Sequence, residues 1–195
     1  MSEKVIMAKI PKQFNANDVL DVGTFDATFS ELRSSLLVVG DGSSAHWDSK
    51  WRNSLVDNLE ILAGQLWSVG IEDIFIDGSF VENKDRPNDI DGYFDTGISQ
   101  VIPQTMQAFE NQVSQLNNID PYKIWTWDPN ARIFDPKSGK AQLPMWMRYK
   151  VELYPHIEGM FSGIRDQHGN NLQFPSAFRQ SRRNFIPKGI VKIVR

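Results

Sequence analysis

The clearest periodic pattern of apolar residues runs from about Asp48 to Val69. Its apolar positions recur every three or four residues, as they do on one face of an α-helix: Trp51, Leu55, Leu59, Leu62, Leu66 and Val69. Gly70 follows as a natural C-terminal stop. The pattern therefore predicts a long amphipathic helix that buries one face.

Two further segments have helical patterns. Residues 24–39, TFDATFSELRSSLLVV, predict a helix, and Thr28 and Glu31 within it have the spacing of a capping box. Pro103 suits the first turn of another helix, whose apolar stripe consists of Met106, Phe109, Val113 and Leu116. Residues 121–144 carry four prolines and predict loops and short strands.

Strand patterns occur at four places. IEDIFID (71–77) is apolar on both faces, which is typical of a buried central strand, and another strand is expected through Tyr93 and Phe94. GIVKIV near the C-terminus predicts a terminal strand. In MWMRYKVELYP (145–155) apolar and charged residues alternate, which predicts a strand with two distinct sides. One side carries Met147, Tyr149, Val151 and Leu153, and the other carries Arg148, Lys150 and Glu152.

This order of helices and strands predicts an α/β (α+β) fold in which helices flank a mixed sheet. At 195 residues the chain suits a single domain. Residues 1–24 form an irregular leader in this interpretation, and residues 167–195 form a basic C-terminal segment. The composition is that of an ordinary globular protein, because 41% of the residues are hydrophobic and 23% are charged.

The composition also excludes several classes of protein. There is no cysteine, which excludes disulfides and thiolate metal sites. No apolar run approaches the ~20 residues of a membrane helix, and the N-terminus has no signal-peptide core. We therefore expect a cytoplasmic protein without a membrane partner.

The net charge of −3 conceals an asymmetry along the chain. Positions 1–166 carry all 24 acidic residues and 15 of the 21 basic ones, a balance of −9. The charged residues beyond them are all basic: Arg179, Arg182, Arg183, Lys188, Lys192 and Arg195. This segment either folds back onto the acidic body or binds a polyanion. Its stretch RQSRRNF has a composition suited to RNA phosphates and base stacking.

The most distinctive chemistry lies in residues 76–94, IDGSFVENKDRPNDIDGYF. If Asp89 and Asp91 lie on a strand, their side chains share one face, about 6.6 Å apart. At an effective dielectric of 20 the two charges repel by roughly 2.5 kcal/mol. Mg²⁺ or Mn²⁺ would relieve this repulsion and suits carboxylate ligands, with Glu152 as a candidate third ligand. The other interpretation of such an acidic pair is a solvated turn.

Gly78 and Ser79 precede this acidic pair, with a spacer of nine residues between. Glycine lets backbone N–H groups approach a phosphate closely, and serine adds a hydroxyl donor. Lys84 and Arg86 in the spacer are candidates for contact with the same anion. Arg52, on the long predicted helix, faces either solvent or the phosphates.

Other types of site do not fit the sequence. An EF-hand loop aligned on the acidic pair would place Pro87 at its first ligand position. KSGK at 137–140 lacks the upstream glycine of a P-loop. The three histidines, His46, His156 and His168, have no metal-binding spacing.

The combined order is an apolar strand, Gly-Ser, nine residues, Asp-apolar-Asp and a later acidic strand residue. It resembles the nucleotidyltransferases of the DNA polymerase beta superfamily. With IPKQFN near the start and PKGIVKI near the end, most of residues 10–193 looks like an uncharacterised group of small nucleotidyltransferase-like proteins from bacteria and their phages. Glu152 and Gly92 depart from the usual pattern, which has Asp and an apolar residue there.

The resemblance implies a nucleotidyltransferase-like sheet and a metal-dependent transfer of a nucleoside monophosphate from a triphosphate to a hydroxyl, with release of pyrophosphate. Asp89, Asp91 and Glu152 would be the catalytic metal ligands, and Gly78 and Ser79 would lie beside the phosphates. The acceptor stays open between an RNA end, a protein and a small molecule, and a homodimer, a partner protein or the basic C-terminal segment would supply its surface. The alternative function is a non-catalytic nucleotide- or RNA-binding accessory protein with the same fold.

Overall fold

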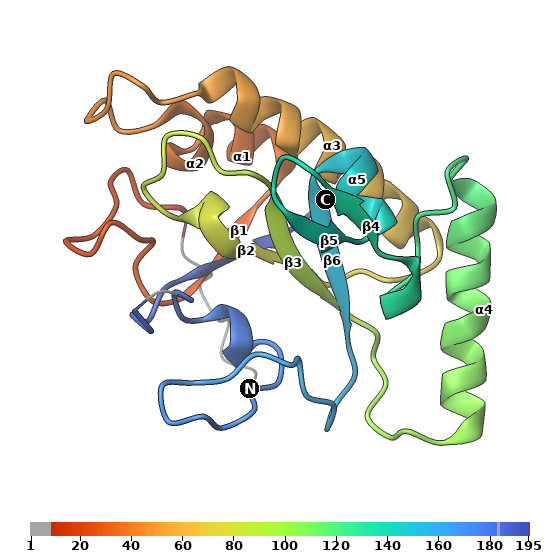
Figure 1. The fold of residues 1–195 in the computed structure, drawn as a ribbon. Coiled ribbons are helices and arrows are strands. Elements are labelled where there is room, and N and C mark those ends of the chain that lie inside the picture. Colours follow the sequence, from red (N-terminus) through yellow and green to blue (C-terminus); the bar gives the residue numbers. More distant parts are fainter. Residues whose placement is uncertain (1–8, 183) are drawn as a thin grey trace, which may run out of the picture.

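The computed structural model describes residues 9–182 and 184–195, which form a central sheet with helices around it (Figure 1). The strands are β1 (Thr24–Ala27), β2 (Ile74–Asp77), β3 (Ile90–Asp95), β4 (Ile133–Asp135), β5 (Lys140–Gln142), β6 (Val151–His156) and β7 (Ile190–Ile193). The α-helices are α1 (Phe29–Ser34), α2 (Leu36–Val39), α3 (Ser49–Ser68), α4 (Pro103–Ile119) and α5 (Pro144–Tyr149). The short 3₁₀ helices are η1 (Gly78–Val81), η2 (Pro129–Ala131) and η3 (Ser176–Phe178).

A five-stranded mixed sheet forms the centre of the molecule, in the order β1-β7-β2-β3-β6. The pairs β1–β7 and β3–β6 are parallel, and β7–β2 and β2–β3 are antiparallel. Strands β4 and β5 form a separate two-stranded hairpin. The expected α/β class, with a mixed sheet flanked by helices, is confirmed.

The two faces of the sheet are covered differently. The main core contains the apolar faces of the α-helices and alternate strand residues such as Ile74 and Ile76. On the opposite face lies an aromatic cluster in which Tyr93 stacks on Phe75, Phe174 and Phe178, with ring centroids 4.7, 5.4 and 5.9 Å away. The cluster shows that the loops after β6 cover this second face.

The strongest periodic pattern predicted its helix correctly. Asp48 caps α3, and its carboxylate accepts the backbone N–H of Trp51. The residues in the middle of the predicted apolar face are wholly buried: Leu55, Leu59, Leu62 and Leu66. The capping box of Thr28 and Glu31 and the helix that begins at Pro103 are also confirmed.

Two weaker patterns gave the wrong element. Residues 24–27 form β1, not helix, because they pair in parallel with β7. Residues 145–149 belong to α5, not to a strand: Pro144 begins this helix, and Lys150 ends it in a left-handed conformation at φ 53°. The alternation of apolar and polar residues over so short a segment does not distinguish a short helix from a strand. Contacts with residues distant in the sequence determine which of the two forms.

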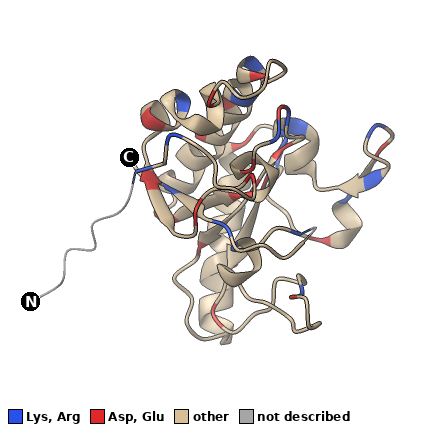
Figure 2. Ribbon diagram, turned by 90° about the vertical axis from the view of Figure 1, so that its left-hand side faces the viewer, with Lys and Arg blue, Asp and Glu red and all other residues tan. Residues whose placement is uncertain are grey.

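The basic C-terminal segment folds back onto the body. Arg179 donates to the Gly23 carbonyl and the Thr24 hydroxyl, at 3.2 and 2.7 Å. Two further ion pairs of the segment join Lys192 to Asp73 and Arg195 to Glu72. Figure 2 shows acidic and basic residues interspersed over the described chain. Residues 1–8 of the expected leader, and Arg183, lie outside the described residues.

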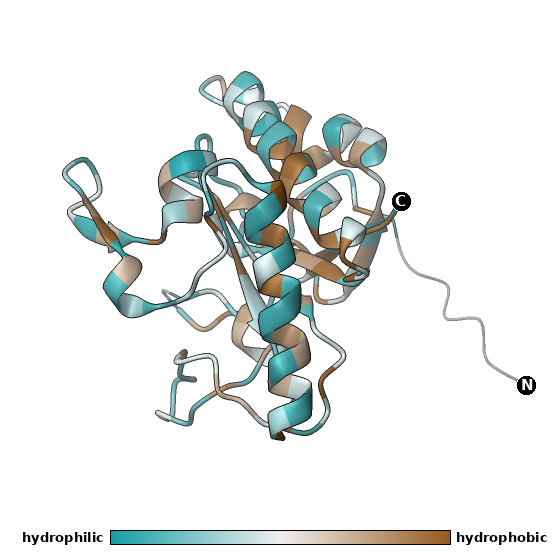
Figure 3. Ribbon diagram, turned by 90° about the vertical axis from the view of Figure 1, so that its right-hand side faces the viewer, coloured by the Kyte–Doolittle hydropathy of each residue, from teal (hydrophilic) through white to brown (hydrophobic). Residues whose placement is uncertain are grey.

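Helix α4 lies at one side of the molecule and is the foreground helix of Figure 3. Of its residues, Phe109 and Leu116 are buried, and much of the remaining surface is hydrophilic. Within the described part of the chain, none of the helices has the length and apolarity needed to cross a membrane.

Candidate metal and nucleotide site

A cleft of about 720 Å³ lies at the start of β3 and β6, on the sheet face that carries the aromatic cluster. Its walls come from η1, the β4–β5 hairpin and residues within 177–182 and 184–188. Seven of the residues proposed from the sequence line this one cleft: Gly78, Ser79, Lys84, Asp89, Asp91, Glu152 and Arg182. Residues that are up to 104 positions apart in the chain therefore meet in a single concave site.

The three candidate carboxylates meet because of the strand pairing. Asp91 on β3 and Glu152 on β6 are direct partners in the parallel register, and neighbouring strands lie about 4.8 Å apart. Asp89 stands just before β3 and also lines the cleft. Glu152 is only 7% exposed, so its carboxylate is largely withdrawn from bulk solvent.

The electrostatics of the cleft are unfavourable for three free carboxylates. The pKa of Asp91 is raised to about 7, mainly by burial and also by the negative charges of Asp89 and Glu152, although Arg182 and Lys188 act in the opposite direction. A cation between such groups would favour their ionised forms. Hard carboxylate oxygens are the ligands that Mg²⁺ and Mn²⁺ prefer, so the donor chemistry fits the expected ion.

Hydrogen bonds hold two of these carboxylates in place. The indole N–H of Trp146 donates to Asp89 Oδ2 at 2.6 Å. The Tyr154 hydroxyl donates to Glu152 Oε2 at 2.7 Å, and the Leu143 N–H donates to Oε1 at 3.4 Å. In this arrangement, no group of three His, Asp or Glu side chains among the described residues is gathered closely enough to hold a metal. A bound ion would replace part of these hydrogen bonds.

Gly78 packs directly against Asp91. Its backbone is left-handed, at φ +69°, and a Cβ placed there would lie 2.9 Å from Asp91 Cβ and closer still to the carboxylate. Glycine is therefore required both by the conformation of the turn and by the neighbouring acidic residue. Gly92, which departs from the expected pattern, is explained in the same way: a Cβ there would lie 2.8 Å from Leu153 Cδ2 and overlap the Phe75 carbonyl.

We expect Gly78→Ala to lower the free energy of unfolding by more than the ~1–2 kcal/mol that a left-handed alanine costs. The added methyl group must displace Asp91, so affinity for a metal–nucleotide ligand should fall as well. Urea unfolding measures the first effect and calorimetry the second. Gly139→Ala is the matched control, since Gly139 has φ +68° and an added Cβ meets nothing within 4 Å. Equal destabilisation by the two changes would contradict the role of the Asp91 contact.

Sequence reasoning missed two buried charges beneath the Gly78 turn. Lys188 is 2% exposed, and its Nζ lies 2.8 Å from the Gly78 carbonyl, 2.7 Å from Glu82 Oε1 and 3.2 Å from Asp77 Oδ1. Burial raises the pKa of Asp77 to about 7, although Lys188 beside it acts in the opposite direction. No local pattern marks Lys188 as buried, because nothing near it in the chain distinguishes it from the other basic residues of its segment.

Three predicted phosphate contacts do not reach the cleft. Arg52 is wholly buried, and it faces neither solvent nor the cleft, because its guanidinium donates to four backbone carbonyls: Leu37, Phe80, Glu82 and Lys84. Arg86 pairs with Asp48 and stacks over the Trp51 ring, 4.3 Å from its centroid. Arg179 is held at the start of β1. The structure therefore places Arg52, Arg86 and Arg179 outside the lining of the cleft.

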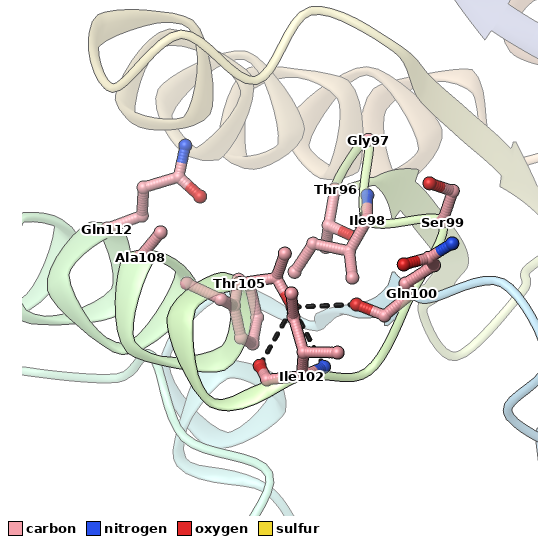
Figure 4. A pocket seen from close by; sticks show the side chains of 10 residues that line it. Thr96, Gly97, Ile98, Ser99, Gln100, Ile102, Thr105, Ala108 and Gln112 are labelled. Carbon is pink, nitrogen blue, oxygen red and sulfur yellow. Dashed lines mark hydrogen bonds between the residues drawn. The ribbon is translucent and has the colours of Figure 1, made fainter.

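A smaller pocket of about 400 Å³ lies beside the N-terminal part of α4 (Figure 4). Thr105 there donates to the carbonyls of Gln100 and Ile102, which ties the preceding loop to the helix. None of its ten lining residues carries a charge. The pocket therefore offers no group for acid–base or metal chemistry.

The fold and the cleft define a small mixed α/β protein with an acidic site at the edge of its sheet. Residues 12–194 match the model of DUF6932, which is described as a family of unknown function. The chain therefore belongs to the DUF6932 family. Neither the curated proteins nor the solved structures contained a match.

Proposed function

We propose that this protein is a metal-dependent nucleotidyltransferase. The observation that carries the proposal is the cleft itself, in which Asp89, Asp91 and Glu152 lie with the Gly78–Ser79 turn. Its volume of about 720 Å³ is within the range of small-molecule sites and suits a nucleoside triphosphate. Such a substrate is available in the cytoplasm, where we place the activity.

The residues of the cleft divide into two functional groups. Asp89, Asp91 and Glu152 would hold Mg²⁺ or Mn²⁺, which when bound supplies neutralisation of phosphate charge and a lower pKa for an attacking hydroxyl. The turn at Gly78 and Ser79 and the side chains of Lys84 and Arg182 would bind the triphosphate, since they offer N–H, O–H and positive groups in the same cleft. Positive and negative groups in one site suit a ligand that joins phosphate to a divalent cation.

The reaction follows from this arrangement. The acceptor hydroxyl oxygen forms a bond to the α-phosphorus, and the bond between that phosphorus and the α–β bridging oxygen breaks. Pyrophosphate leaves with the electron pair of the broken bond, and the Glu152 carboxylate takes the proton of the acceptor hydroxyl. Glu152 suits this role because its low exposure reduces competition from water.

We expect calorimetry to detect Mg²⁺-dependent binding of at least one of ATP, CTP, GTP and UTP. Asp89→Asn and Asp91→Asn should each weaken that binding at least about tenfold, because each removes one charged ligand of the metal. Asp95→Asn is the matched control, since Asp95 lies on the same strand but is exposed and accepts the Gly97 N–H instead. Binding that needs no metal and survives both changes would sink the proposal.

One observation favours the second candidate, a nucleotide- or RNA-binding protein without turnover. Both oxygens of Glu152 already accept hydrogen bonds from this chain, so a metal would compete with the Tyr154 hydroxyl and the Leu143 N–H for the third carboxylate. Incubation with labelled triphosphates, total RNA and lysate separates the two candidates. Labelled product that Asp91→Asn abolishes supports the transferase, and binding with no product under any condition supports the binding protein.

A further inference from the structure

The β4–β5 hairpin forms one wall of the cleft and extends beyond it. Figures 2 and 3 show the hairpin standing out from the body of the molecule. Arg132, Lys140, Ala141 and Gln142 line the cleft, so the hairpin and the candidate site share a continuous surface. Arg132 also ties the base of the hairpin together by donating to the Ala141 carbonyl at 3.1 Å.

The hairpin exposes large apolar side chains next to the site. Phe134 is 64% exposed and Ile133 is 49% exposed. Phe134 is the cross-strand partner of Ala141, and directly paired residues of an antiparallel hairpin lie on the same face. Because Ala141 lines the cleft, Phe134 stands beside a residue of the cleft wall.

The exposed charge of the hairpin is positive. Its basic residues are Arg132, Lys137 and Lys140, of which the two lysines are exposed. Asp135 is the acidic residue between them, but it is 7% exposed and its carboxylate accepts the Ser138 N–H inside the turn. Solvent therefore meets two lysines and an aromatic ring, not an acidic surface.

We infer that this hairpin binds a single-stranded nucleic-acid end and presents its terminal hydroxyl to the cleft as the acceptor. The inference rests on the proposed function. It reduces the possible acceptors from three classes, an RNA end, a protein and a small molecule, to the nucleic-acid end. A single strand offers phosphates for Lys137 and Lys140, and unstacked bases for the Phe134 ring. An acidic peptide would match the charge of the hairpin but has no regular series of flat rings for Phe134.

The inference is tested by fluorescence anisotropy with a labelled single-stranded RNA 12-mer. We expect Phe134→Ala to weaken binding by at least about fivefold, the lower limit for loss of one base–aromatic stack. The double change Lys137→Ala with Lys140→Ala should lower the slope of log affinity against log salt by about 1.4, which corresponds to two phosphate contacts on a single strand. Phe161→Ala and Lys50→Ala are the controls, since Phe161 is 63% exposed and neither residue lines the cleft.

Two measurements keep this inference distinct from the proposed function. Triphosphate binding, measured by calorimetry, should be unchanged in Phe134→Ala, since Phe134 does not line the cleft, and transfer of label to the 12-mer should fall with the same change. Equal RNA binding by hairpin and control variants, or binding of an acidic peptide but not of RNA, would overturn the inference and leave the triphosphate site standing. RNA binding through the hairpin without any triphosphate binding would overturn the acceptor role and the proposed function together.

Discussion

Replacement of Arg52 by Ala is expected to lower the free energy of unfolding by about 3–5 kcal/mol, because each buried acceptor that loses its donor costs about 1–3 kcal/mol. Arg52 is 0% exposed and donates to the carbonyls of Leu37, Phe80, Glu82 and Lys84, so its removal leaves buried acceptors without donors. Burial lowers the pKa of Arg52 to about 9, and the guanidinium is still charged at neutral pH. A loss of this size is a large part of the free energy of unfolding of a typical domain, which is ~5–15 kcal/mol.

The loss should appear as a lower midpoint in urea unfolding. Arg52→Lys is expected to recover a minor part of it, because one ammonium group cannot reproduce the planar fork that reaches four carbonyls. The guanidinium also lies 3.9 Å from the centroid of the Trp47 ring, a contact that Arg52→Ala removes. Arg33→Ala is the control, since Arg33 pairs with Asp57 and Glu60 at the surface and should cost no more than ~1 kcal/mol. If the urea midpoint of Arg52→Ala equals that of Arg33→Ala, the four carbonyls that accept from Arg52 have found other donors.

The second large effect is expected for Lys188→Met. The change leaves Asp77 buried at 2% exposure without its cation, and it removes the donor to the Gly78 carbonyl at 2.8 Å. We expect a loss of about 3–5 kcal/mol in the free energy of unfolding. Because Gly78 begins the turn in the cleft, weaker binding of triphosphates should accompany the loss of stability.

Two further variants separate charge from packing at this site. Lys188→Met combined with Asp77→Asn should recover part of the lost stability, since no unpaired charge then remains beside the methionine. Lys192→Met is the matched control from the same segment, because Lys192 pairs with Asp73 at a partly exposed position. If Lys188→Met and Lys192→Met lower the unfolding midpoint equally, the buried pair does not support the turn.

Local sequence patterns were sufficient to predict an element where the residues that define it lie within its own segment. Helix α3 was predicted within one residue at each end, because its apolar period and its Gly70 stop lie in the segment itself. The turn at Gly78 and the acidic pair at Asp89 and Asp91 were also placed together from the sequence, since they stand at the two ends of the connection between the neighbouring strands β2 and β3. The joining of an antiparallel pair by a short loop brings such residues close without any help from the rest of the chain.

Residues whose role depends on distant partners were predicted less well. Arg52 has the sequence context of a surface arginine, yet its guanidinium is buried between α2 and the loop after η1. Lys188 has the context of a basic tail, yet it neutralises charges from residues more than 100 positions away. Long flexible side chains do not reveal their partners through periodicity, because burial of a charge depends on which acceptors the fold brings to it.

The sequence by itself determined the class of fold, the long helix and the short segment that holds the glycine turn and the acidic pair. Periodic burial and turn chemistry act over a few residues, so they are readable from one chain. Only the tertiary structure decided that Glu152 stands opposite Asp91, because the parallel pairing of β3 with β6 joins strands separated by helix α4 and the hairpin. That pairing turns two separate acidic segments into one cleft, since strand register is set by contacts across the whole sheet.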